Sequence, residues 1–475
     1  MNEAGLSEER TMVHILADAA VMITMNGERD VLADAAVCVE ADRIVDIGKT
    51  AGLLARYPGA DVLDCSGKIV MPGMVNTHTH LFQTLLKGLG DDMVLKKWFA
   101  CMTGPAAVHL TRDDIRCAAL HGCIESILSG VTTLVDFQYV NTQPGMLDAV
   151  VDAFEHSGMR GFVCRGFMTR GREFGVPGAL IEDAEAVMRH VREAVRRYNR
   201  PGGRVQVGIA PCMVWTVDRE AYRLVRKLAD EEGILITTHV AETDFEIARA
   251  RADFDCTDTE MLGDIGFLGP DVLAVHCVNC SSRDIRTLRY HGASVSHNPC
   301  SNLYLASGVA PIPEMLASGV TVGLGSDGPA SSNNHSLFQA MKFAALIQKG
   351  VNRDATIMTA EKALEMATID GARAVGLENE IGSLEIGKKA DIVVVDTDSA
   401  WLAPLHNAPS ALVYSALGHE VSSVMIDGRF VMRERAMLTV DAAQARHAAQ
   451  QAADDLARRA AIAPLKSRPW RSTAV

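Results

Sequence analysis

The sequence has no run of apolar residues approaching the roughly 18 to 20 that a membrane-spanning helix requires. Its first residues, MNEAGLSEERTMVHIL, are polar and acidic, so they lack the basic start and apolar segment of a secretory signal. Basic residues number 46 against 59 acidic ones, for a formal net charge of −13, and they form no stripe that could follow a phosphate backbone. We therefore expect neither nucleic acid nor a membrane among the partners.

Cysteine is present, but not in the pattern of a disulfide framework. The 11 cysteines are odd in number and scattered along the chain, which suits reduced thiols in the cytoplasm. Cys277 and Cys280 have the spacing of half a zinc ribbon, but no second pair completes four ligands. We therefore interpret this pair as two small apolar residues near a strand end, and we expect a cytoplasmic protein.

The chain also lacks low-complexity linkers and repeats, so its segments are distinguished only by their patterns of apolar, β-branched and polar residues. Residues 1–66 contain short β-branched runs around the turn pair Asn26-Gly27, and residues 386–440 are β-rich again. We expect these two segments to pair into one small β-sandwich. Residues 441–475 contain the alanine-rich stretch DAAQARHAAQQAADDLARRAAI, which predicts an exposed C-terminal helix.

Between these segments, residues 67–385 alternate short apolar runs with longer amphipathic stretches such as AEAVMRHVREAVRRY. Eight such runs, rich in β-branched residues, occupy 68–80, 131–137, 161–167, 205–212, 234–242, 272–279, 293–301 and 320–328. Eight strands with apolar middles, each followed by a helix, are typical of a parallel barrel. The sequence thus predicts an α/β fold, a (β/α)8 TIM-type barrel beside a small β-sandwich.

Titratable side chains stand at the ends of four of these runs. The first, VMPGMVNTHTH, ends in His78 and His80, which project to the same side because strand side chains alternate. The fifth run contains His239, the sixth His276 and the eighth Asp327. The carboxyl ends of barrel strands surround one cavity, where such groups would reduce stability unless paired or ligated. The pattern therefore predicts a metal site.

Imidazole and carboxylate ligands suit zinc or divalent iron, and such a metal lowers the pKa of a water molecule from about 15.7 toward 7. Asp327 can bind the metal and accept the water proton. Glu242, three residues after His239, is placed to pass a proton to the substrate, and His276 to stabilise a tetrahedral intermediate. The fourth run, VQVGIAPCMVW, has no lysine to bridge two metals, so we favour a single metal.

In order along residues 12 to 440, the motifs PGMVNTHTH, HVAET, VHC, SHNPCSN, GLGSDG and GSLEIGKKADIVVVD resemble the amidohydrolase superfamily, in its mononuclear aminohydrolase branch. The resemblance implies that one divalent metal, zinc or alternatively iron, is bound by His78, His80, His239 and Asp327. It implies Glu242 as the proton shuttle, and His276 as a catalytic residue or a further ligand. By the same analogy we expect a homo-oligomer, a dimer or larger.

The branch includes s-triazine hydrolases and deaminases of purines and of S-adenosylhomocysteine or methylthioadenosine. The nucleoside deaminases usually have a glutamate where this chain has Ala107 and a histidine where it has Cys212, which argues against a nucleoside. Gln83, in HTHLFQTL, resembles the triazine and 8-oxoguanine hydrolases, and its carboxamide can both donate and accept. We expect hydrolytic deamination of an amino-substituted nitrogen heterocycle of purine, pterin or s-triazine type, with release of ammonia.

Three alternatives remain open at this point: a deaminase of S-adenosylhomocysteine or methylthioadenosine, a two-metal cyclic amidase, and a barrel that only binds ligands. Trp98 is a candidate to stack on a flat ring or to lie in the core, and Ser331 to touch the leaving group or serve as a turn residue. The expected substrate-binding residues are Gln83, Trp98, Cys212, His297, Asn302 and Ser331.

Overall fold

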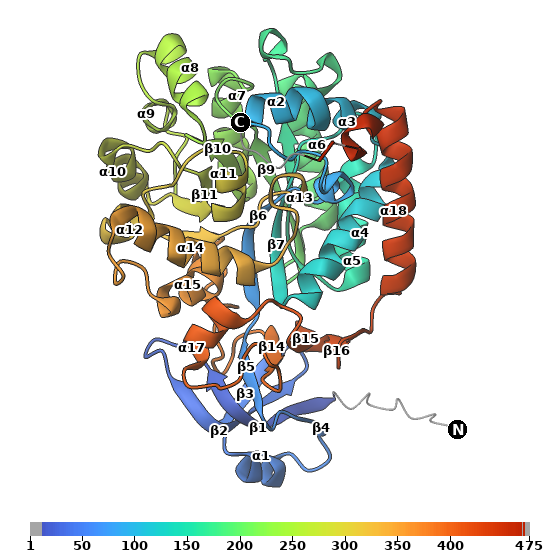
Figure 1. Cartoon of the computed structure of the whole chain (residues 1–475), viewed down its shortest axis with the longest axis vertical. Coiled ribbons are helices and arrows are strands. Elements are labelled where there is room, and N and C mark those ends of the chain that lie inside the picture. The colour runs from blue at the N-terminus through green and yellow to red at the C-terminus, as the bar shows by residue number, and fades with distance from the viewer. Residues whose placement is uncertain (1–11, 468, 471–475) are drawn as a thin grey trace, which may run out of the picture.

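The computed structural model describes residues 12–467 and 469–470. Within them, eight parallel strands form a nearly closed barrel in the order β13-β12-β11-β10-β9-β8-β7-β6 (Figure 1). These strands are β6 (Met74–Thr79), β7 (Val131–Gln138), β8 (Arg160–Phe167), β9 (Val205–Pro211), β10 (Ile236–Val240), β11 (Val272–His276), β12 (Ser294–His297) and β13 (Val322–Leu324). Each predicted apolar run therefore overlaps one barrel strand, which confirms the predicted fold class.

Hydrogen bonds near the carboxyl ends of β6 and β13 bring the two ends of this sheet together. The amide of Asp327 donates to the carbonyl of His78 at 3.0 Å, and the hydroxyl of Thr79 donates to the carbonyl of Asp327 at 3.1 Å. Nearer the middle, Ser326 donates its amide to the side-chain oxygen of Asn76 at 3.0 Å. Closure of the barrel thus places the two predicted ligand-bearing strand ends side by side.

Helices surround the barrel because the connecting segments have one apolar face. In α6 (Ala184–Tyr198), Val187, Val191 and Val195 recur at a spacing of four and are buried, and Asp183 caps the helix by accepting from the amide of Ala186 at 2.8 Å. The other helices of this layer are α4 (Arg112–Leu128), α5 (Met146–Ser157), α7 (Arg219–Glu232), α8 (Asp244–Phe254), α9 (Asp258–Asp264), α10 (Ser282–His291), α11 (Pro299–Tyr304), α12 (Ile312–Ala317), α13 (Pro329–Ser332), α14 (Leu337–Asn352), α15 (Ala360–Ala367) and α16 (Ile369–Ala374).

The connection from β6 to β7 is long, and the first half of it runs over the carboxyl end of the barrel. It contains the 3-10 helix η1 (Leu81–Leu86), α2 (Leu95–Trp98), the π-helix η2 (Phe99–Thr103) and α3 (Gly104–His109). In Figure 1, α2 and α3 lie at the end of the molecule opposite the small sheet. This segment therefore contributes one side of any cavity at the strand ends.

The two chain-terminal β segments form one mixed sheet of nine strands within the described residues, shown below the barrel in Figure 1. Its strands are β1 (Val13–Ile23), β2 (Val31–Glu40), β3 (Arg43–Gly48), β4 (Asp61–Asp64), β5 (Lys68–Pro72), β14 (Ile392–Asp396), β15 (Val421–Ile426), β16 (Arg429–Arg433) and β17 (Ala436–Met437). β5 pairs with β1 in parallel and with β14 antiparallel, which joins the two segments. The run predicted at 68–80 is thus two strands, β5 in the small sheet and β6 in the barrel.

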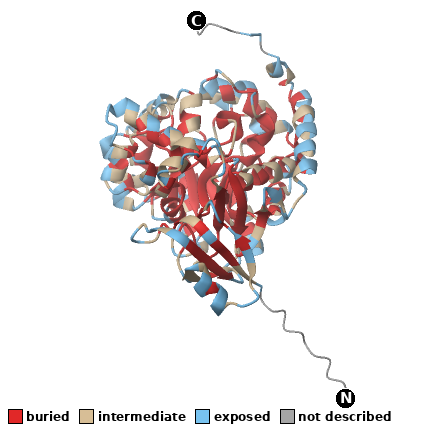
Figure 2. Ribbon diagram, turned by 60° about the horizontal axis from the view of Figure 1, so that its bottom comes forward, coloured by how far each residue is buried: buried red, intermediate tan, exposed pale blue. Residues whose placement is uncertain are grey.

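The C-terminal helix α18 (Ala442–Arg459) lies along the outside of the barrel beside α4 (Figure 1). It is not exposed on every side, because Ala445, Ala449 and Leu456 are buried. Figure 2 shows the barrel strands as buried along nearly their whole length, whereas the small sheet also has intermediate and exposed residues. No helix in residues 12–467 is long and apolar enough to cross a membrane.

Candidate active site

Three predicted ligands from two strands meet at the carboxyl end of the barrel. One ring nitrogen from each of His78, His80 and His239 lies within 4.8 Å of the others, and all three side chains are buried. In a second group, one ring nitrogen each from His78 and His276 and one carboxylate oxygen of Asp327 also lie within 4.8 Å of one another. The strand ends therefore bring the predicted imidazoles and carboxylate into one cluster.

Hydrogen bonds from the outer ring nitrogens fix how these imidazoles face. Nδ1 of His80 donates to the carbonyl of Phe137 at 2.8 Å, and Nδ1 of His239 donates to the carbonyl of Cys212 at 2.9 Å. A proton held at Nδ1 leaves the lone pair on Nε2, which is the form that binds a metal. Both strands beside the cluster thus help to set the tautomers.

Asp327 is held by three donors. Its Oδ1 accepts from the amide of Gly328 at 2.7 Å, and its Oδ2 accepts from Ser301 at 2.5 Å and Ser331 at 3.2 Å. Oδ1 also lies 3.3 Å from Nε2 of His78. Burial alone raises the pKa of Asp327, but the close approach of His78 and the other imidazoles outweighs it and holds the pKa well below its ordinary value.

The donor set fits a divalent metal. Burial lowers the pKa of His78, and that of His80 to about 3, so these imidazoles stay neutral at physiological pH. Neither ring nitrogen of His78 has a hydrogen-bond partner among the described residues, although both are buried. Buried lone pairs without donors are costly unless ligated, and three imidazoles with one carboxylate are ligands that zinc and iron accept.

Glu242 and His276 face each other beside this cluster. Oε2 of Glu242 lies 3.6 Å from Nε2 of His276, and Oε1 accepts from Ser307 at 3.4 Å. Burial, with the nearby charge of Asp327, raises the pKa of Glu242 to about 8, so that its carboxyl keeps a proton near neutral pH. Glu246 anchors the turn by accepting from the amide of Glu242 at 2.6 Å.

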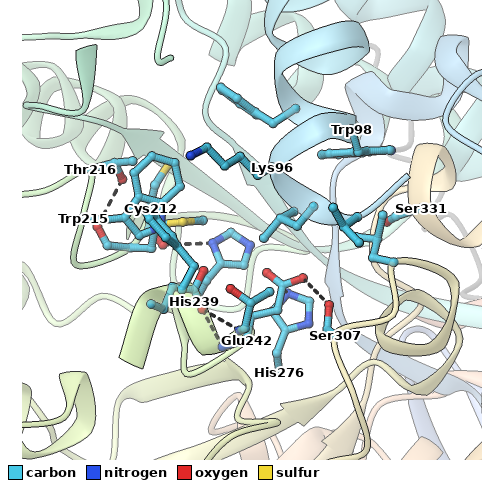
Figure 3. Close-up of a pocket in the computed structure, with 18 of the residues that line it drawn as sticks. Lys96, Trp98, Cys212, Trp215, Thr216, His239, Glu242, His276, Ser307 and Ser331 are labelled. Atoms are coloured by element: carbon cyan, nitrogen blue, oxygen red, sulfur yellow. Dashed lines mark hydrogen bonds and ion pairs between the residues drawn. The ribbon is translucent and has the colours of Figure 1, made fainter. Parts of the chain in front are cut away.

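The cavity above these groups has a volume of about 300 Å³, at the lower end of the range for small-molecule sites. Its lining includes the predicted Gln83, Trp98, Cys212 and Ser331 together with His80, His239, Glu242, His276 and Asp327 (Figure 3). Trp98 lines this space and donates its indole N–H to the carbonyl of Ala330 at 2.9 Å. The barrel mouth therefore combines polar groups with a flat aromatic surface.

Two predicted substrate-binding residues lie elsewhere. Asn302 is buried behind His276, whose Nδ1 donates to the amide oxygen of Asn302 at 2.8 Å. His297 is also buried and lies outside the cavity lining. Asn302 thus contacts the catalytic candidate His276 and does not line the cavity.

Sequence reasoning missed a group of aromatic residues that line the same cavity, namely Phe99, Tyr139, Phe174, Trp215 and Phe245. They lie in segments that follow barrel strands and have no periodicity of their own. Trp215 stands three residues after Cys212, and its closeness to the end of a predicted strand is the feature of the sequence that could have identified it as a lining residue.

Comparison with known proteins gives the same family over most of the chain. A model of the amidohydrolase family matches residues 69–431, and one of a bacterial imidazolonepropionase-like composite domain matches residues 35–60. A 5'-deoxyadenosine deaminase of Methanosarcina mazei is 36% identical over 94% of this chain and 99% of its own. A 5-methylthioadenosine/S-adenosylhomocysteine deaminase of Desulforudis audaxviator is 38% identical over 85% of this chain and 91% of its own.

Solved structures support the fold. A zinc-bound adenosine deaminase of Xanthomonas campestris superposes with a TM-score of 0.88 at 28% identity, over 94% of this chain and 98% of that one. A zinc-bound atrazine chlorohydrolase of Arthrobacter aurescens gives a TM-score of 0.87 at 23% identity, over 93% of this chain and 100% of that one. This protein therefore belongs to the amidohydrolase family, as a hydrolase that acts on carbon–nitrogen bonds.

Proposed function

We propose that this protein is a hydrolytic deaminase that converts an adenine nucleoside to the corresponding 6-oxo compound and ammonia. The observation that carries the proposal is the meeting of Glu242, a buried carboxyl whose pKa is raised, with the His–Asp cluster in one cavity. His78, His80, His239 and Asp327 would hold one divalent ion, zinc rather than iron. When bound, such an ion lowers the pKa of water toward about 7 and so supplies a nucleophile at neutral pH.

The residues of the chain supply the proton transfers. Glu242 donates its proton to the ring nitrogen next to the amino-bearing carbon, while the water oxygen attacks that carbon and Asp327 accepts a water proton. His276 stabilises the charge that develops on the attacking oxygen. Asp327 then protonates the amino group, the carbon–nitrogen bond breaks, and ammonia leaves. The remaining hydroxyl returns a proton to Glu242, which restores both carboxyl groups.

Support for a nucleoside comes from relatives that are more than 35% identical over most of their length and are named for adenosine derivatives, among them the two described above. Two positions at which this chain departs from the nucleoside deaminases, 107 and 212, lie in different environments in the structure. Ala107 is fully buried and lies outside the cavity lining, whereas Cys212 lines it. The chain has neither the ribose-binding glutamate at 107 nor the histidine at 212, so the binding of a ribose has to come from other residues.

A second candidate is deamination of a free aminopurine, pterin or s-triazine. It is favoured by Gln83, whose buried side chain lines the cavity and can pair with the amino and oxo edge of such a ring. The two candidates share the reaction and differ in whether a sugar is required.

Ammonia release from zinc-reconstituted protein tests both. The substrates would be 5'-deoxyadenosine, methylthioadenosine, S-adenosylhomocysteine, adenosine, adenine, 8-oxoguanine, isoxanthopterin and melamine. Turnover of the adenosyl compounds with no turnover of the free bases is expected, and the reverse would establish the second candidate. Glu242→Gln keeps the shape of the side chain without its acid, and should lower kcat by about 10²- to 10⁴-fold. Full activity in Glu242→Gln would disprove the proposed proton transfer.

We further propose one zinc ion per chain, a homo-oligomeric assembly and a cytoplasmic location. The zinc proposal is supported by the neutral histidine set and by the zinc in related structures. Metal analysis of protein purified without added metal is expected to find about one zinc per chain, as three imidazoles and a carboxylate fill a single site. Two metals per chain would instead favour a cyclic amidase.

Light scattering coupled to size-exclusion chromatography measures the mass of the particle in solution and so tests the proposed homo-oligomeric assembly.

A further inference from the structure

Three aromatic side chains form a continuous surface at the rim of the cavity. Phe174 ends the 3-10 helix η3 (Arg172–Phe174), Trp215 follows β9, and Phe245 lies in the first turn of α8. The ring centroids are 5.7 Å apart for Phe174 and Trp215, 5.5 Å for Phe174 and Phe245, and 5.6 Å for Trp215 and Phe245, all edge to face. We call these three residues the aromatic wall.

The proposed reaction makes no use of the aromatic wall. All three residues line the cavity, and all three are only partly buried, so apolar surface faces the space above the reacting groups. In Figure 3, Trp215 and Thr216 lie on one side of this space and Trp98 and Ser331 on the other. Nε1 of Trp215 is buried and has no hydrogen-bond partner among the described residues. The cavity therefore has room and chemistry for more than the ring that reacts.

The charges around this space discriminate between possible substituents. Among the described residues, the lining contains four acidic side chains, Glu242, Asp244, Glu246 and Asp327, and no arginine. The basic residue Lys96 lies with its Nζ 5.4 Å from the ring centroid of Phe245, where a cation is attracted by the ring face. A phosphate would therefore find no guanidinium in the described lining, whereas an uncharged apolar group would cover aromatic surface.

We propose that the aromatic wall is the subsite for an uncharged, apolar 5' substituent of the nucleoside, such as a methyl or methylthio group. This inference rests on the proposed nucleoside deaminase function and narrows its substrate class. Phe174, Trp215 and Phe245 are specificity-determining residues, which contact the part of the substrate remote from the reacting carbon. One additional apolar group in such a pocket changes specificity by about 10- to 200-fold.

Steady-state kinetics with adenosine, 5'-deoxyadenosine, methylthioadenosine and adenosine 5'-monophosphate test the subsite. We expect kcat/KM for methylthioadenosine to exceed that for adenosine by about tenfold or more, with the monophosphate the poorest substrate. Phe245→Ala should remove most of this preference by lowering kcat/KM for methylthioadenosine far more than kcat/KM for adenosine, because adenosine has no apolar 5' group to lose. Phe245→Leu keeps apolar area and should retain part of the preference. Phe254→Ala is the matched control, since Phe254 lies on the same helix, is also partly buried and does not line the cavity.

Binding to the zinc-loaded Glu242→Gln protein, measured by calorimetry, separates failure of the subsite from failure of the function. Equal kcat/KM for adenosine and methylthioadenosine, or equal losses for both in Phe245→Ala, would overturn the subsite and leave the deaminase function standing. Absence of ammonia from every nucleoside would reject the function. In that case, tighter binding of methylthioadenosine than of adenosine would still support the subsite, and equal binding would overturn it.

Discussion

For His80, His239 and His276, one hydrogen-bond acceptor behind the ring determines which nitrogen faces the cavity. For His80 and His239 that acceptor is a backbone carbonyl, which belongs to the neighbouring strand and does not depend on the identity of a side chain. For His276 it is the amide oxygen of Asn302, 2.8 Å from Nδ1. The orientation of His276 is therefore the one that a side-chain substitution can test directly.

Replacing Asn302 by leucine is expected to lower kcat about 10- to 100-fold, the usual effect of removing an outer hydrogen-bond partner, because the buried Nδ1–H of His276 loses its acceptor. Asn302→Asp keeps an acceptor oxygen at the same place and should recover part of the activity, with KM close to that of the native protein. Steady-state kinetics of the two variants at matched zinc content make the comparison. Equal losses of activity in both would show that Asn302 acts through packing alone.

The polar cluster was predictable because two simple rules coincide there. Alternation along a strand places His78 and His80 on one side, and the strand ends of a parallel barrel converge. The environment of Asn302 was not predictable in this way. The residue follows His297 by five positions, and the short helix α11 turns the chain so that Asn302 lies behind His276 rather than in the cavity. That turn depends on packing between elements, which no periodicity in the sequence records.

At the scale of secondary-structure elements, the predicted strands match the structure except at the first run. There β5 and β6 are both apolar and buried, so hydrophobicity alone does not divide them. The division falls at Gly73, where a Cβ atom would lie 2.1 Å from the hydroxyl of Thr132 on β7. A glycine is required by this close approach of the chain to β7, and the chain passes there from the small sheet into the barrel.

The helix α18 differs from its predicted exposed state because one of its faces packs on α4. Leu456 is fully buried, so Leu456→Ala should lower the free energy of unfolding by about 2 to 5 kcal/mol through lost burial and a residual cavity. Urea unfolding followed by circular dichroism gives the change. Leu438→Ala, at a leucine with 57% of its surface exposed, is the control and should alter stability by less than about 0.5 kcal/mol. If the two variants were equally stable, α18 would not be docked on the barrel in solution.

At the scale of the whole molecule, a buried ion-pair network joins the barrel to the small sheet. Arg160, the first residue of β8, donates to both carboxylate oxygens of Asp391 at 2.7 and 3.0 Å and to Asp427 at 2.9 Å. Asp391 precedes β14, and Asp427 lies in the turn between β15 and β16. The two sheets therefore share charges that neither could leave buried alone.

Arg160→Met should lower the free energy of unfolding by about 3 to 5 kcal/mol, because it leaves Asp391 buried without its positive partner. The matched control is Arg223→Met, which removes an exposed pair with Glu220 and should change stability by no more than about 1 kcal/mol. Urea midpoints of both variants at pH 7 provide the comparison. An unchanged midpoint in Arg160→Met would mean that the network contributes nothing to holding the two sheets together.

The same network predicts how stability depends on pH. Burial raises the pKa of Asp427, but Arg160 and Lys389 outweigh it and hold the pKa below its ordinary value of 3.8. A carboxyl whose pKa is lower in the folded state binds fewer protons there than in the unfolded state. Its stabilising contribution is therefore complete at neutral pH and is lost as the pH falls below about 5 and through the folded-state pKa. Asp427→Asn should lower the urea midpoint at pH 7 and show a shallower decline than the native protein between pH 5 and pH 3. Parallel declines in the two proteins would show that Asp427 titrates alike when folded and unfolded, and that its contacts with Arg160 and Lys389 do not form in solution.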